Sequence, residues 1–153
     1  MSDRDQAKGP PPGAPAFADL PPAGAWLEAL GMVLDEISGT RVKGHLELGA
    51  RHHTPWGVVH GGVYTTVIES VASVGASAAV FERGQFAVGV HNATDFLRSM
   101  REGSVEVVGE PVIQGRVQQL WQVTITRRED GKAIAQGRVR LQNVPLTAPS
   151  NSA

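Results

Sequence analysis

The stretch from Gly61 to Phe81 constrains the fold most strongly, because it runs for twenty-one residues without Pro, Lys, Arg or Asp. Its β-branched residues favour a strand, but strands of this length are rare and helices of this length are ordinary. Small residues (Ala, Gly and Ser) occur on every side of the predicted helix. A helix that is apolar all round is usually buried. The sequence therefore predicts a buried central helix.

Glu69 is the one charged residue in this stretch and lies near its middle. An ionised carboxylate in apolar surroundings costs free energy unless it is paired or used. A membrane span would place such a charge at the bilayer centre, at a cost of roughly 2.5–3.5 kcal/mol, without long apolar residues to offset it. We therefore expect a core helix, no membrane partner, and a functional role for Glu69. The alternative is a buried carboxylate bonded to neighbouring Ser or Thr.

Length and composition narrow the class of protein. The 153 residues are typical of one domain, and the net charge of −1 gives no reason to expect nucleic acid as a partner. Without cysteine, the chain has no thiol nucleophile and no Cys-based zinc site, and His52, His53 and His91 lack the spacing of a metal site. We expect no metal. The N-terminus lacks the apolar core of a signal peptide, which favours the cytoplasm.

The two ends of the chain differ in composition from its middle. Residues 1–22 hold six of the ten prolines, and such a composition predicts a disordered tail. A second flexible tail is expected at 145–153, so the folded domain is predicted over 23–144. It opens with a short helix at 23–30 that ends at Gly31.

The remaining segments predict strands. A hairpin is expected from 32–37 and 40–48, and four strands follow the helix at 85–97, 104–113, 116–126 and 132–141. In the first of these four, Asn92 and Thr94 share a face with the apolar residues Phe86, Val88, Val90 and Phe96. Asn92 and Thr94 therefore either line a pocket or pair inside the protein. Short connections favour an antiparallel sheet, and the simplest α+β solution is a sheet of five to six strands wrapped around the one long helix. One sheet leaves a side of that helix uncovered, which predicts an oligomer.

The motif His60-Gly61-Gly62, preceded by Trp56-Gly57 and followed by Glu69, resembles that of the hotdog-fold acyl-CoA thioesterases. The branch it is most similar to contains the Arthrobacter-type 4-hydroxybenzoyl-CoA thioesterases and the PaaI-like group, and the resemblance covers about residues 30–143. It implies a hotdog fold and a homodimer, often paired into a homotetramer, with its active site across the interface. It also implies hydrolysis of an acyl-CoA without a cofactor other than the CoA of the substrate.

The resemblance also implies roles for individual residues. Glu69 corresponds to a carboxylate that acts as nucleophile or base, Gly61 to the N–H that polarises the thioester carbonyl, and Ser73 to a hydroxyl one turn later. Arg98 corresponds to an arginine near the CoA phosphates, although such a residue is equally often a plain surface charge. The chain departs from the family at Thr54, where an amide side chain is usual. Either Thr54 or His53 substitutes for that amide, or its contribution is missing.

The chemistry of thioester cleavage agrees with these roles. Free N–H groups at a helix start can hold an oxyanion, and Gly61 and Gly62 let a carbonyl approach that backbone. His60 is expected to cap the helix rather than to act as a base. Gly61 and Glu69 lie eight residues apart, about 12 Å along one helix, so a single helix can hardly supply both groups to one carbonyl. Two antiparallel helices from two subunits can.

We therefore expect an acyl-CoA thioesterase that acts on an aromatic or medium-chain acyl group. Two alternatives remain open from the sequence. One is a hotdog hydratase or dehydratase acting on acyl thioesters, for which no catalytic Asp/His set is evident. The other is a non-catalytic module that binds acyl-CoA, which the threonine at position 54 keeps open.

Overall fold

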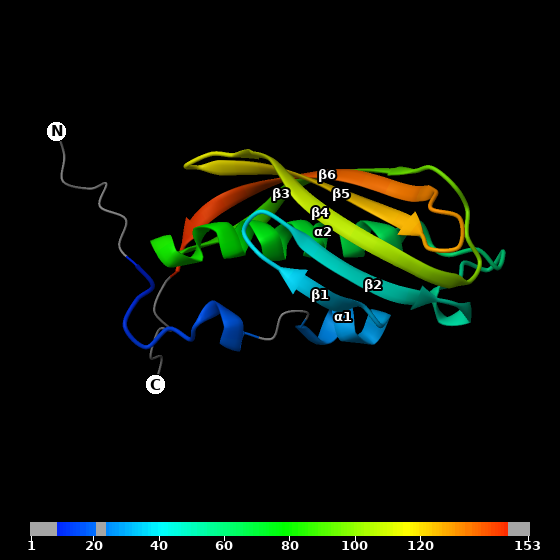
Figure 1. Ribbon diagram of the computed structural model, residues 1–153, viewed down its shortest axis with the longest axis horizontal. Helices are drawn as coiled ribbons and strands as arrows, with labels where there is room; N and C mark the ends of the chain where they lie inside the picture. Colours follow the sequence, from blue (N-terminus) through cyan, green and yellow to red (C-terminus); the bar gives the residue numbers. More distant parts are fainter. Residues whose placement is uncertain (1–8, 21–23, 147–153) are drawn as a thin grey trace.

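The computed structural model describes residues 9–20 and 24–146, and one antiparallel sheet curls around one long helix within them (Figure 1). The helix is α2 (Gly61–Val80), continued by the 3-10 turn η3 (Phe81–Arg83). The other elements, in chain order, are η1 (Phe17–Asp19), α1 (Gly24–Leu30), β1 (Val33–Ile37), β2 (Val42–Leu48), η2 (Ala50–His52), β3 (Gln85–Phe96), β4 (Gly103–Gln114), β5 (Gln118–Arg127) and β6 (Ala133–Pro145). The predicted α+β fold is confirmed.

The six strands follow the order β1-β2-β4-β5-β6-β3, and every neighbouring pair is antiparallel. The predicted hairpin of β1 and β2 is present, and β2 buries Val42, Gly44, Leu46 and Leu48 on its inner face. The strand that follows α2 in the chain lies at the far edge of the sheet, beside the last strand. β1 and β3 are thus the two edges.

Helix α2 forms the centre of the core, and most of its length is buried or half-buried. Its small residues allow close packing: the indole of Trp121, which is fully buried, lies against Gly75, where a Cβ would collide with the ring. The helix is long and apolar enough to cross a membrane, but it is the core helix around which the sheet curls (Figure 1). The predicted buried helix is confirmed.

A β-bulge in β3 changes which of its residues face the helix. The register with β6 shifts between Gly89 and His91, so that Val90 is the extra residue. Ala87 and Gly89 pair with inward residues of β6 before the bulge, and Asn92 and Thr94 do so after it. The expectation of one continuous face from Phe86 through Val88 and Val90 to Phe96 is therefore wrong. A second bulge lies in β1, between Leu34 and Glu36.

Local structure occurs near both ends of the described chain. Residues 1–8 and 21–22 of the predicted N-terminal tail lie outside the described residues, as do 147–153 of the C-terminal one. Residues 9–20, by contrast, include the turn η1, and the ring of Phe17 meets that of Phe81 edge-on with centroids 5.2 Å apart. β6 runs four residues beyond the predicted Leu141, and the N–H of Leu146 bonds to the carbonyl of Gly84.

Candidate active site

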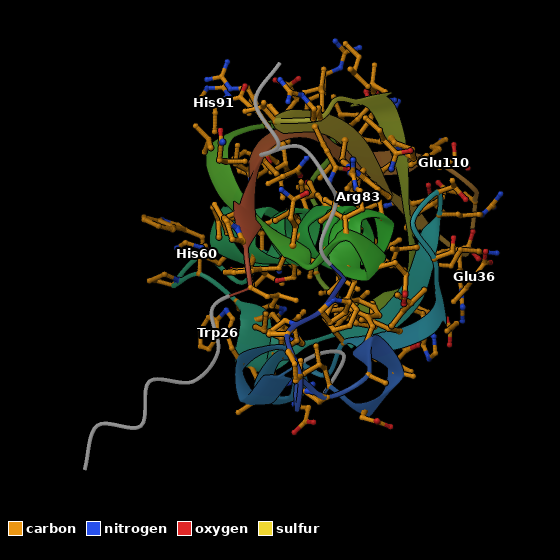
Figure 2. The ribbon with its side chains drawn as sticks, turned by 90° about the vertical axis from the view of Figure 1, so that its left-hand side faces the viewer. Trp26, Glu36, His60, Arg83, His91 and Glu110 are labelled. Atoms are coloured by element: carbon orange, nitrogen blue, oxygen red, sulfur yellow. The ribbon has the colours of Figure 1, made fainter. Side chains whose placement is uncertain are left out.

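The N-terminus of α2 is capped by His60, as expected. Its Nδ1 accepts a 2.8 Å hydrogen bond from the N–H of Gly62, which satisfies one of the free donors of the first turn. Because Nδ1 is an acceptor here, the ring is fixed in one orientation at the helix start. His60 lies on the outside of the molecule, on the same side as Trp26 and opposite Glu36 and Glu110 (Figure 2).

Gly61, the first residue of α2, keeps its N–H free of any hydrogen bond to the described residues. The ring of Phe96 packs on this glycine so closely that a Cβ would lie 2.9 Å from Phe96 Cζ. Gly61, Phe96 and Arg98 line a cavity of about 360 Å³. A free N–H at the positive end of a long helix, in a residue that lines a cavity, is suited to bind an oxyanion.

The carboxylate of Glu69 is half-buried and held by the strand opposite it. Asn92 Nδ2 donates a 2.9 Å hydrogen bond to Glu69 Oε2, and the Thr94 hydroxyl donates a 2.7 Å bond to Asn92 Oδ1. Oε1 lies against Gly89, where a Cβ would collide with it. Among residues 9–20 and 24–146, no cation pairs with this carboxylate. Asn92 therefore orients the carboxylate of Glu69.

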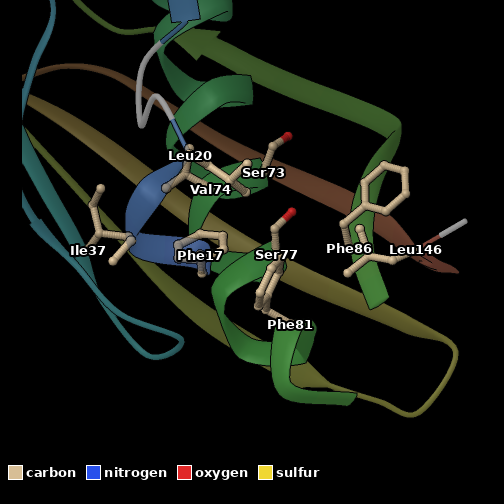
Figure 3. A pocket seen from close by; sticks show the side chains of 10 residues that line it. Phe17, Leu20, Ile37, Ser73, Val74, Ser77, Phe81, Phe86 and Leu146 are labelled. Carbon is tan, nitrogen blue, oxygen red and sulfur yellow. The ribbon is translucent and has the colours of Figure 1, made fainter. Parts of the chain in front are cut away.

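Ser73 lies one turn after Glu69 on the same side of α2, but no hydrogen bond joins the two side chains within the described residues. The Ser73 hydroxyl instead lines a cavity of about 640 Å³, shared with Ser77 (Figure 3). The role of Ser73 in orienting Glu69 or a water stays a prediction.

The loop before α2 contains His53 and Thr54, the two residues that could replace the amide side chain usual in the family. Their side chains differ in hydrogen bonding. His53 Nε2 donates a 2.6 Å bond to the carbonyl of Arg101, which ties the loop to the segment before β4. The Thr54 hydroxyl is buried and has no hydrogen-bond partner among the described residues. A buried polar group without a partner is rare and calls for an explanation. Thr54 is thus the residue of the two with hydrogen-bonding capacity to spare.

Arg98 follows β3 and is exposed. Its Nη1 donates a 2.6 Å bond to the carbonyl of Ala133, which anchors the side chain beside the cavity that Gly61 lines. The rest of the guanidinium is available to an anion, and phosphate binding by Arg98 stays a prediction.

Tyr64 lies one turn into α2 and lines the same cavity. Its ring packs near that of Phe96, and its hydroxyl is buried without a hydrogen-bond partner among the described residues. Burial raises the pKa of this phenol to about 12, so it stays protonated at neutral pH and can donate a hydrogen bond.

Sequence reasoning named Glu69, Asn92 and Thr94 separately, and the structure joins them into one hydrogen-bonded chain. It missed Gly89, although a glycine inside a strand is a signal of a bulge or a close approach. In residues 9–20 and 24–146, no group of three or more His, Asp or Glu side chains is placed to hold a metal.

Comparison with known proteins agrees with this geometry. A sequence model described as the thioesterase superfamily matches residues 57–134. A Mycobacterium tuberculosis protein named “Putative esterase Rv1847” is 44% identical over 117 residues, which cover 75% of this chain and 83% of that protein. Its solved structure has a TM-score of 0.77, with 41% identity over 80% of this chain and 98% of that one.

Two further relatives carry more specific names. The 1,4-dihydroxy-2-naphthoyl-CoA thioesterase 2 of Arabidopsis thaliana is 39% identical over 101 residues, which cover 65% of this chain and 62% of that protein. The structure of thioesterase HI1161 from Haemophilus influenzae has a TM-score of 0.76 at 26% identity, over 84% of this chain and 89% of that one.

A sheet curled around one long helix is the hotdog fold, and this fold together with relatives named thioesterases identifies a thioester hydrolase. The chain belongs to the thioesterase superfamily. The predicted fold and family are confirmed, and the branch within the family stays a prediction.

Proposed function

We propose that this protein hydrolyses an acyl-CoA thioester to the free acid and CoA, with the carboxylate of Glu69 as nucleophile or general base. The observation that carries the proposal is the hydrogen bond from Asn92 to Glu69 in the absence of a cationic partner among the described residues. A structural carboxylate in a core is normally paired, whereas this one is oriented by a neutral amide and remains reactive.

The two oxygens of Glu69 have different surroundings. Oε2 accepts the bond from Asn92, and Oε1 accepts none from the described residues. Oε1 is therefore the atom that attacks the thioester carbonyl or removes a proton from the attacking water. In the general-base route Glu69 takes a proton from the water that adds to the carbonyl carbon, the C–S bond breaks, and the leaving thiolate of CoA takes up that proton. In the nucleophilic route Oε1 forms a mixed anhydride as the C–S bond breaks and the CoA thiolate leaves, and water then hydrolyses the anhydride to the free acid and restores the carboxylate of Glu69. The N–H of Gly61 stabilises the oxyanion formed on the way.

Both groups reach one carbonyl only if two protomers share the site, because eight residues separate them by about 12 Å on one helix. Strand β3 supports such a dimer: it is an edge strand with a single neighbour, and Val88, Val90 and Phe96 on it are exposed. Pairing of two β3 strands covers these side chains and brings the second helix alongside the first. Two such dimers in a homotetramer are compatible with this arrangement.

Residues near the start of α2, together with Arg98, are proposed to bind the substrate. Thr54 and the N–H of Gly62, with its cap His60, lie at the helix start where the thioester carbonyl docks, and Arg98 is placed to meet the CoA phosphates. The reaction needs no metal or redox cofactor. We expect the protein to act in the cytoplasm, since it has no cysteine to form the disulfides of secreted proteins.

The direct test is release of free thiol from a panel of acyl-CoAs by the wild type, Glu69→Gln and Glu82→Gln. Glu82 is an exposed carboxylate just beyond α2 and serves as the matched control. We expect hydrolysis by the wild type and by Glu82→Gln, and a loss of at least about 10³-fold in Glu69→Gln with an unchanged melting temperature. Full activity of Glu69→Gln rejects the mechanism. Hydration of an enoyl-CoA without thiol release would show the hydratase alternative, and binding without turnover the non-catalytic one.

The dimer is tested separately by light scattering on the eluting protein. Val90→Asp places a charge on the exposed face of β3, whereas Val33→Asp does so on the other edge, at a residue of similar exposure. We expect only Val90→Asp to produce monomers, and these to be inactive. An active monomer would refute a site shared between protomers.

A further inference from the structure

The larger cavity lies beside the second half of α2 and is apolar. It has a volume of about 640 Å³, and among the described residues that line it only Ser73 and Ser77 have polar side chains. The walls include Val74 and Phe81 from the helical segment and Phe86 from β3 (Figure 3). No charged side chain of residues 9–20 and 24–146 lines it, so the cavity is suited to an uncharged, apolar group.

The cavity lies along the same side of α2 as the candidate active site. Glu69, Ser73 and Ser77 are spaced four residues apart and lie along one side of α2. This side faces β3, because Glu69 lies against Gly89 and the Ser77 hydroxyl accepts a 3.0 Å bond from the N–H of Ala87. One turn, about 6 Å along the helix axis, leads from Glu69 to the cavity lining at Ser73.

The outer wall of the cavity comes from the N-terminal segment of the chain. Phe17 lines it from the turn η1 and Leu20 from the position just after that turn, and Phe17 is held by its edge-on contact with Phe81. Leu146, tied to Gly84 by a backbone hydrogen bond, contributes from the C-terminal side. All three residues lie outside the range 57–134 that the superfamily model matches.

We infer that this cavity receives the acyl group of the substrate and that Phe17 and Leu20 form the wall against which the far end of a long acyl group packs. The inference rests on the proposed function. With its carbonyl at Glu69, an acyl chain that runs along α2 passes Ser73 and enters the space below Phe17 and Leu20. The class of ligand is an uncharged apolar acyl group that extends beyond one turn of helix, such as a medium-chain acyl group of about eight carbons. A terminal carboxylate on the acyl group is excluded, since it would be desolvated without a partner.

The contribution of Phe17 and Leu20 to acyl-group binding is tested by measuring acyl-CoA affinity in a variant that does not hydrolyse the ligand. Titration calorimetry on the Glu69→Gln background compares acetyl-, butyryl-, hexanoyl- and octanoyl-CoA, so that CoA contacts are constant and only acyl length varies. Buried methylenes contribute up to about fourfold each in affinity. Three variants are added to that background: Phe17→Ala with Leu20→Ala opens the wall, Leu20→Trp fills the cavity, and Trp26→Ala is the control. Trp26 is 65% exposed, comes from the neighbouring helix α1 and does not line the cavity.

We expect affinity to rise from acetyl- to octanoyl-CoA in the background protein and in Trp26→Ala. The opened variant and Leu20→Trp should each bind octanoyl-CoA at least tenfold more weakly while acetyl-CoA binding changes less than twofold. Octanoyl-CoA binding that is unchanged in either variant, or an equal loss for acetyl- and octanoyl-CoA, overturns the inference. Leu20 is 36% exposed, so Leu20→Ala alone keeps the test available if the double variant unfolds.

This readout separates the inference from the proposed function. If the wild type releases no thiol from any acyl-CoA, the proposed hydrolysis fails, whereas the length dependence of binding still reports on the cavity. If the wild type is active but affinity is independent of acyl length, hydrolysis stands and the acyl group lies elsewhere.

Discussion

The side-chain amide of Asn92 donates a 2.9 Å hydrogen bond to Oε2 of Glu69, and this bond joins the edge strand β3 to the middle of the central helix. Asn92 is itself oriented, since its Oδ1 accepts a bond from the Thr94 hydroxyl. An amide that donates to a carboxylate fixes its rotamer without neutralising its charge. Asn92 is therefore a positioning residue for the proposed reaction.

Replacing Asn92 by Ala should lower kcat by about 10- to 100-fold, because a hydrogen bond to a charged group is worth about 1.5–3 kcal/mol. KM should change little, since Asn92 acts through Glu69. Thr94→Val removes only the bond to Asn92 Oδ1, so its effect should be smaller. Steady-state kinetics with a thiol reagent measures both variants. Wild-type kcat in Asn92→Ala would remove Asn92 from the mechanism.

Gly89→Ala should inactivate the protein without unfolding it. The new Cβ collides with Oε1 of Glu69, which is the far end of a flexible side chain, so the carboxylate moves while the backbone stays. We expect a loss of activity similar to that of Glu69→Gln, with a circular dichroism spectrum like that of the wild type. Gly49→Ala is the matched control, because Gly49 has extended backbone and open space around its Cβ position. Equal activity of the two alanine variants would contradict the placement of Glu69.

His60→Ala should lower the free energy of unfolding by about 1 kcal/mol, since it removes the cap on the Gly62 N–H. Asn accepts the same kind of bond, so His60→Asn should recover most of the loss. Denaturant titration measures the stability of both variants. Unchanged stability combined with a loss of activity as large as that of Glu69→Gln would make His60 a catalytic base instead of a cap.

Tyr64 is the single tyrosine of the chain, so its ionisation can be followed directly by near-ultraviolet absorbance. Burial raises its pKa to about 12 in the folded protein, above the value of about 10 expected when unfolded. Between these values the folded state holds a proton that the unfolded state has lost, so stability should fall as pH rises from about 10 to 12. A native titration that coincides with the one in guanidinium chloride would show that the phenol is not buried.

Much of the fold is predictable from local patterns in the sequence. The length and small residues of 61–81 predict the buried helix, and the clear alternation of Val42, Leu46 and Leu48 predicts an inner strand face. Glu69 stands out because a charge within an apolar helix is costly. The capping role of His60 follows from its place just before two glycines that open a helix.

The unpredicted parts depend on contacts between distant segments. The bulge at Val90 has a local cue in Gly89, but only pairing with β6 decides where the extra residue falls. The bond between Asn92 and Glu69 follows from that bulge, because regular alternation would turn either Gly89 or Asn92 away from the helix. No local sequence pattern predicts the contact between the rings of Phe17 and Phe81. The proline-rich composition of the segment predicts its average behaviour, whereas the contact depends on one aromatic ring within it.

Both outer strands of the sheet contain a bulge, at Leu34/Glu36 in β1 and at Gly89/His91 in β3. Each irregularity interrupts the row of free N–H and C=O groups that an added strand would use, so open-ended growth into fibres is disfavoured at either side. In a dimer with a two-fold axis, the edge strand of the second copy carries the same bulge and runs in the opposite direction. Only a few pairing registers accommodate the bulges of both strands. The bulge in β3 that lets Asn92 hold Glu69 inside the protein thus also limits how a neighbour can attach outside it.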